Sequence, residues 1–113
     1  FQLSQAGVKA WRVAALQALG SPQRSPNPLL LGLANLSQLR EEESMQALEL
    51  YRQGLEARRA RVRSRWQTGG ADLASHVHAM FDFSLTMIEA EINWVERFIL
   101  RLQQGSALYP PEV

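Results

Sequence analysis

Apolar residues recur at helical spacing in four segments of this 113-residue chain. The first segment runs from about Ser4 to Leu19, and the hydroxyl of Ser4 can cap its first turn. Residues 20–28 follow and contain three prolines, which cannot continue a helix. The pattern therefore predicts a helix, then a proline-rich linker.

The second and third segments begin with polar or acidic residues, as helices do. Asn27 and Pro28 have the order of a helix cap and a first helical residue, and the apolar run 29–36 that follows should be buried. The third segment runs from about Leu39 to Thr68, with three glutamates in its first turns and five arginines near its end. Both charge clusters suit the helix dipole, and Gly69-Gly70 ends the segment.

The fourth segment, from about Asp72 as N-cap to Gln104, is apolar on more than one side. Sorted by intervals of seven, its large apolar residues form three rows. The first row contains Phe81, Ile88, Val95 and Leu102. The second row contains Leu73, Met80, Met87 and Trp94. The third row contains Leu85, Ile92 and Ile99. One neighbouring helix cannot cover all three, and an uncovered row would exceed the apolar area that a monomer usually exposes.

The short connection at Gly69-Gly70 makes the third and fourth helices antiparallel. Residues whose numbers add up to about 139 should then lie opposite each other, an estimate that follows from the short loop. The predicted fold is all-α, with two short N-terminal helices followed by a long antiparallel helical hairpin. We expect the hairpin to dimerise, because one face of its last helix packs within the chain and another face remains.

Composition excludes several classes of protein. The chain has no cysteine, so disulfides, thiolate zinc sites and cysteine nucleophiles are excluded. No apolar run reaches the ~18 residues of a membrane-spanning helix, and no signal peptide is visible, so we expect a cytoplasmic protein without membrane contact. The net charge of +1 separates into a basic block at residues 57–66 and a mostly acidic stretch at residues 71–104, which can pack against each other.

Candidate chemistry is sparse. The i, i+4 pairs of Asp72 with His76 and of His78 with Asp82 lack a third ligand, so we predict no metal site. With no phosphate-binding loop and no nucleophile–base pattern, we expect neither an enzyme nor a cofactor. The arginines at 58–65 could contact nucleic-acid phosphates, but a solvated helix end complementary to Asp82 is the preferred interpretation.

Two further groups bear on function. Glu91 lies on an apolar face and needs a partner, for which Arg52 or an arginine of a second chain is the candidate ion pair. Flat and adaptable side chains could line a ligand pocket, although ordinary core or interface packing explains them more simply. The candidate pocket residues are Trp66, Met80, Met87 and Trp94.

Two phrases carry a resemblance to a known family. The run Ala90-Glu91-Ile92-Asn93-Trp94-Val95-Glu96-Arg97 resembles the Ala-Glu-Leu-x-Trp-Leu-Glu pattern in the C-terminal domain of PadR-family transcriptional regulators. It looks most like the branch with the virulence-activator (AphA-like) domain. Phe1-Gln2-Leu3-Ser4-Gln5-Ala6-Gly7 resembles the Tyr-x-Leu-Thr-x-x-Gly phrase at the end of that family's winged-helix domain. Asn93 departs from the family, which has a small or apolar residue there.

The resemblance implies a division of the chain. Residues 1–20 would be the end of a winged-helix domain and a connecting helix, and 21–28 the linker. Residues 29–105 would be a helical dimerisation and effector-response domain, and 106–113 an extended tail. DNA binding is implied only for the parent protein, through an N-terminal winged helix-turn-helix domain that this chain lacks.

On this interpretation the chain is the coiled-coil-like dimerisation domain of a homodimeric transcription regulator, with a small molecule as a candidate effector. The alternatives are a stand-alone helical adaptor for another protein and a small-molecule-binding helical bundle. The residues predicted for the dimer interface are Phe81, Ile88, Glu91, Trp94, Val95 and Phe98.

Overall fold

The computed structural model describes residues 4–22 and 27–105, and Phe1 to Leu3 and the predicted tail 106–113 lie outside this description. The described residues form helices and no strand, as expected for an all-α fold. Their contacts divide the chain into two units, with the boundary between Ala34 and Asn35. The first unit holds α1 (Gln5–Gly20) and α2 (Pro28–Ala34). The second unit holds η1 (Leu36–Gln38), α3 (Glu41–Gly69), η2 (Gly70–Asp72) and α4 (Ser75–Gln103).

Helix α1 begins where the polar pattern predicts. The Ser4 side chain accepts a hydrogen bond from the Gly7 amide at 3.1 Å, which confirms Ser4 as N-cap. No residue of α1 is buried, and even Trp11 is 67% exposed. Helix α1 is therefore held by its own backbone hydrogen bonds and its cap, with its apolar side chains uncovered.

Helix α2 confirms one prediction and corrects another. Asn27 Oδ1 accepts a hydrogen bond from the Leu29 amide at 3.0 Å, so Asn27 caps the helix as expected. The expected burial is wrong, because no residue of α2 is buried and Leu30 and Leu31 are 64% and 70% exposed. A helix of seven residues has leucines on all sides, and no neighbouring surface can cover every side of it at once.

Helix α3 has defined ends. At its start the backbone amide of Arg40 donates to Glu43 Oε1 at 3.1 Å, the return bond of a capping box, and three glutamates lie in the first turn. At its end Gly70 has a φ of 64°, a left-handed conformation that glycine adopts without steric cost. The predicted stop at Gly69-Gly70 is thus confirmed.

Helix α4 begins two residues later than predicted. Asp72 belongs to η2, and Ala74 occupies the N-cap position, so the prediction of Asp72 as N-cap is wrong. The extra turn lengthens the connection between the two long helices. As a result Tyr51 meets Glu91 and Trp66 meets His78, a shift of a few residues from the estimate based on a tight loop.

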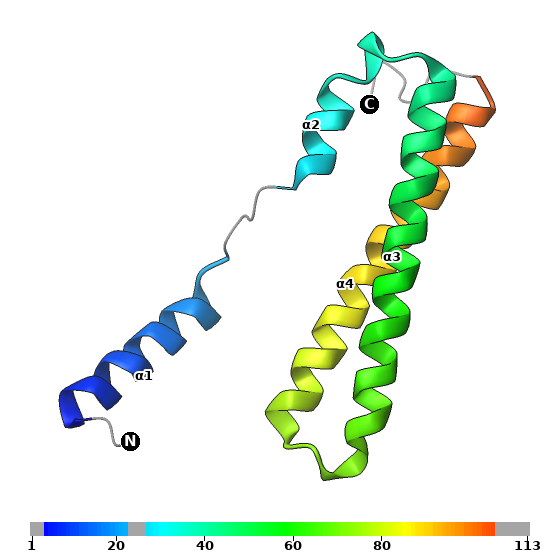
Figure 1. The fold of residues 1–113 in the computed structure, drawn as a ribbon. Helices are drawn as coiled ribbons and strands as arrows, with labels where there is room; N and C mark the ends of the chain where they lie inside the picture. The colour runs from blue at the N-terminus through cyan, green and yellow to red at the C-terminus, as the bar shows by residue number, and fades with distance from the viewer. Residues whose placement is uncertain (1–3, 23–26, 106–113) are drawn as a thin grey trace. The chain divides into compact units, whose positions relative to one another are not determined.

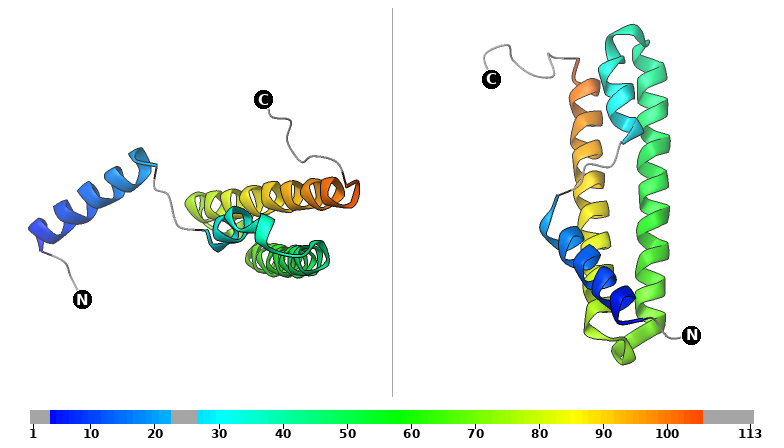
Figure 2. Two further views of the ribbon diagram at one scale, coloured as in Figure 1. Left: turned by 90° about the horizontal axis from the view of Figure 1, so that it is seen from above. Right: turned by 90° about the vertical axis from the view of Figure 1, so that its left-hand side faces the viewer.

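The core of the second unit lies between α3 and α4, which lie side by side in all views as α4 runs back along α3 (Figures 1 and 2). Each buried aliphatic side chain contributes roughly 1.5–3 kcal/mol. The first and third rows of α4 face this core, while Met80 and Met87 of the second row are exposed. The buried apolar residues are Leu48 and Leu55 of α3 and Ile88, Ile92, Val95, Phe98 and Ile99 of α4. Within residues 4–22 and 27–105, no helix has the length and apolar character needed to cross a membrane.

Candidate functional site

Helix α4 carries a second apolar surface outside the core, which we call the outer stripe and define as Met80, Phe83 and Met87. These side chains are 65%, 67% and 53% exposed. Their spacing of three and four residues places them on one side of the helix. Single exposed apolar residues are common, but three large neighbours on one helix face are typical of a contact surface.

Trp94 lies seven residues beyond Met87, two helical turns farther along the same side of α4. Its indole is half-buried and stacks on the Phe98 ring, with centroids 4.9 Å apart and planes at 12°. Stacking of this kind is worth about 0.5–1.5 kcal/mol beyond the buried area. A small hollow beside this stack is lined by Trp94, Arg97, Phe98 and Arg101.

The residues predicted for a dimer interface divide into two groups. Ile88, Val95 and Phe98 are buried in the core of a single chain. Because α3 and its neighbours already cover them, they present no surface to a second copy, which corrects the expectation for these three. Phe81, Glu91 and Trp94 are half-buried and keep accessible atoms.

Glu91 finds its partner within the chain, but the partner is not Arg52. The Tyr51 hydroxyl donates a hydrogen bond to Glu91 Oε2 and so links α3 to α4. Arg52 instead bonds Glu49 and, through Nη1 at 2.9 Å, Glu56, both on its own helix. The bond from Arg52 lowers the pKa of Glu49 below its ordinary value. The expected Arg52–Glu91 ion pair is thus replaced by a tyrosine–carboxylate bond and by ion pairs along α3.

Trp66 lies at the opposite end of the hairpin from Trp94. Its indole Nε1 donates to His78 Nδ1 at 2.8 Å, and its ring stacks on Phe81 with centroids 5.8 Å apart and planes at 11°. His78 Nδ1 is therefore an acceptor, which places the imidazole proton on Nε2. We call Trp66, His78 and Phe81 the Trp66 cluster, and its contacts join the end of α3 to the start of α4.

The predicted ligand pocket is not formed by one group of residues. Met80 and Trp94 are fourteen positions apart on α4, or roughly 21 Å at 1.5 Å per residue. Trp66 lies beside His78, still farther from Trp94. The four residues therefore belong to three separate places, namely the Trp66 cluster, the outer stripe and the Trp94 hollow.

Phe83 is the residue that sequence reasoning missed. Sorting by intervals of seven hides it, because His76, Ala90 and Arg97 occupy the positions seven and fourteen residues away. The alternative spacing of three and four residues links it to Met80 and Met87. That spacing was the signal available in the sequence.

The arginines of α3 contribute little to a chemical site. Arg63 Nη2 bonds Glu89 Oε1 at 3.0 Å across the two helices, with both side chains about half exposed, so this pair contributes at most about 1 kcal/mol. Across the described ranges, no group of three histidine or acidic side chains is placed to hold a metal ion.

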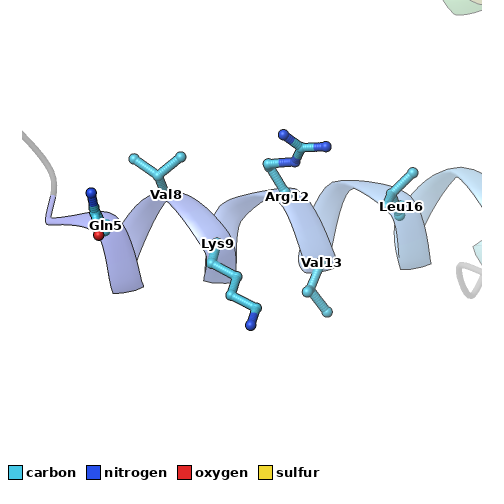
Figure 3. A pocket seen from close by; sticks show the side chains of 6 residues that line it. All are labelled: Gln5, Val8, Lys9, Arg12, Val13 and Leu16. Carbon is cyan, nitrogen blue, oxygen red and sulfur yellow. The ribbon is translucent and has the colours of Figure 1, made fainter.

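A shallow hollow also runs along α1 (Figure 3). In that view Val8 and Arg12 follow one edge and Lys9 and Val13 the other, so the surface is open and amphipathic. All its labelled side chains come from one helix, which cannot enclose a small ligand. The lining residues are Gln5, Val8, Lys9, Arg12, Val13 and Leu16.

Comparison with known proteins adds no family to this picture. No family model matches the chain, and no curated protein and no solved structure is significantly similar to it. The outer stripe is thus the feature on which a function can be argued.

Proposed function

We propose that this chain is the dimerisation and effector-response domain of a DNA-binding transcription regulator of the PadR type. Two copies associate through the outer faces of α4 and set the distance between two DNA-binding domains. The observation that carries the proposal is the outer stripe, in which Met80, Phe83 and Met87 are exposed on a helix that buries another face against α3. The Glu-x-x-Trp phrase of α4 and the sequence phrase at residues 1–7 support the regulator assignment.

Burial of apolar side chains on the hairpin is uneven. The two 29-residue helices bury seven apolar side chains between them and leave the three of the outer stripe uncovered. A two-fold contact brings the same patch of both copies together, so three exposed residues become six buried ones. The half-buried Trp94 extends this contact by two turns and provides an aromatic residue of the kind enriched at interfaces.

The alternatives predict different occupants of the same surface. A helical adaptor would use the outer stripe for an unrelated protein and remain a monomer alone. A ligand-binding bundle would need an enclosed cavity of about 300 Å³ or more. The hollow at Trp94, of about 100 Å³, is smaller than that, so the dimer is the better-supported proposal.

A fusion experiment tests the proposal. A monomeric DNA-binding domain is placed before Phe1, and binding is measured on DNA with one half-site and with two. We expect the fusion to bind two half-sites at least about tenfold more tightly, because dimerisation makes the second contact intramolecular. Phe83→Glu should remove most of this advantage by placing a carboxylate in the contact.

Leu100→Glu is the matched control, because Leu100 is 55% exposed on α4 but lies outside the outer stripe. This variant should keep the two-site advantage. Equal affinity of the unmodified fusion for one and two half-sites would contradict the proposal.

A further inference from the structure

A row of small or apolar residues runs along the side of α3 that faces away from α4, where a solvent-facing helix surface is usually polar. Leu48 and Leu55 turn inward and are buried, while Leu50 is 69% exposed. Ala47, Gly54 and Ala57 share the side of Leu50, since the four positions are separated by three, four and three residues, and all are exposed. We call these four residues the α3 seam.

Gly54 is the least expected residue of the seam. It lies in the middle of a 29-residue helix, where glycine weakens the helix relative to alanine. A Cβ atom added to Gly54 would meet nothing within 4 Å, so packing inside the chain does not require glycine there. The space above Gly54 is open, and Leu50 lies on the same side of the helix.

We infer that the α3 seam is a self-complementary contact in which α3 helices of two copies pair antiparallel about an axis near residue 52. In this register Leu50 of one copy fits over Gly54 of the other, and Ala47 lies against Ala57. Both contacts occur twice because the symmetry repeats them. The small residues let the helices approach closely, and the leucine fills the space that the glycine leaves.

The distribution of charge along α3 favours antiparallel pairing of the two copies. The first turn of α3 holds Glu41, Glu42 and Glu43, and its second half holds exposed arginines, among them Arg61 on the seam side. Antiparallel pairing brings Arg61 of one copy opposite Glu43 of the other at both ends of the contact, where Glu43 also bonds Arg40 of its own chain. Parallel pairing would place like charges together, which is unfavourable. In the described part of the chain Arg61 bonds no carboxylate, so its charge is available.

This inference goes beyond the proposed function. The outer stripe is on α4 and the seam on α3, so the two surfaces make two separate contacts. A chain with both would form dimers through one surface and pairs of dimers through the other. The α3 contact buries small side chains, so it should be the weaker and more salt-sensitive of the two.

Disulfide crosslinking between single introduced cysteines tests the register directly, because the chain has no cysteine of its own. Ala47→Cys and Ala57→Cys chains, one of them carrying a tag that changes its size, are mixed and oxidised. In the inferred register position 47 faces position 57 of the other copy, within disulfide reach, while two copies of position 47 are about 15 Å apart along the axis. We expect the mixed disulfide at about tenfold the level of either homodisulfide.

The same mixture is oxidised in a Phe83→Glu background, in which the α4 contact is disrupted. Crosslinking there depends on the α3 contact alone, so failure of one contact is distinguished from failure of the other. The mixed disulfide should persist there. The inference would be overturned if mixed disulfides and homodisulfides formed in the proportions of random pairing. It would also be overturned if crosslinking did not exceed that of a Gln67→Cys control, which lies off the seam.

Gly54→Leu provides an independent test by filling the gap. The variant should raise the dissociation constant of the α3 contact at least about tenfold, because the new leucine at position 54 and Leu50 of the other copy would then occupy the same space. Gln67→Leu adds the same side chain to the exposed end of the same helix and should leave association unchanged. Equal association of the two variants and the unmodified chain would also overturn the inference.

Discussion

The Tyr51 hydroxyl on α3 donates a hydrogen bond to the Glu91 carboxylate on α4, and this bond joins the two long helices near the middle of the hairpin. This hydrogen bond explains why a carboxylate is found between the buried Ile88 and Ile92. A half-buried carboxylate without a donor would be costly, so the bond favours the register in which Tyr51 and Glu91 meet.

Loss of the Tyr51 donor should therefore weaken the fold. Tyr51→Phe keeps the ring and leaves Glu91 without its hydroxyl partner. We expect the free energy of unfolding to fall by about 1.5–3 kcal/mol, as for a hydrogen bond to a charged group. Urea unfolding followed by circular dichroism measures this. Glu91→Gln keeps an acceptor and should cost less, and an equal or larger loss would show that the bond is not the cause.

The core and the outer stripe should respond differently to truncation. Val95 is 0% exposed, so Val95→Ala should lower the free energy of unfolding by about 2 kcal/mol through the cavity it leaves. Met87→Ala removes an exposed side chain and should change the stability of the isolated hairpin by less than about 0.5 kcal/mol. Chemical unfolding at low protein concentration separates the two effects. Similar losses would mean that Met87 is part of the core.

Acid should remove one stabilising pair. The hydrogen bond from Arg52 lowers the pKa of Glu49 in the folded chain. A lowered folded pKa stabilises the fold at pH values above the unfolded pKa of ~4.3, and this contribution is lost as the pH falls through the folded pKa.

The difference in urea midpoint between the unmodified chain and Glu49→Gln should therefore be largest near neutral pH and shrink below about pH 4.3. Glu42→Gln is the control, since Glu42 is exposed and makes no ion pair in the described structure. A difference that stays constant across this range would contradict the role given to Glu49.

Local signals in the sequence predict much of the fold. Ser4 and Asn27 are short polar residues directly before apolar runs, and each caps a helix as expected. The division of α4 into rows also shows that one neighbouring helix leaves an apolar side uncovered. These features depend only on spacing and on residues close in sequence.

Features that depend on the geometry between helices could not be predicted in the same way. The short helix η2 shifts the pairing of α3 and α4 by a few residues, so Tyr51 rather than Arg52 reaches Glu91. Arg52 also has two glutamates within one turn on its own helix, and these nearby partners prevail over a carboxylate on another helix. Phe83 falls outside the seven-residue rows, because the exposed side of α4 follows intervals of three and four residues.

The central claim is that the outer stripe of α4 joins two copies of this chain. Sedimentation equilibrium of the full chain between low and high micromolar concentration tests it most directly. In a Gly54→Leu background, which blocks the α3 seam, we predict a mass that approaches twice the 12.7 kDa of one chain. We expect a return to 12.7 kDa when Phe83→Glu is added to this background, but not when Leu100→Glu is added. A mass of 12.7 kDa for the unmodified chain over the whole range would contradict the account.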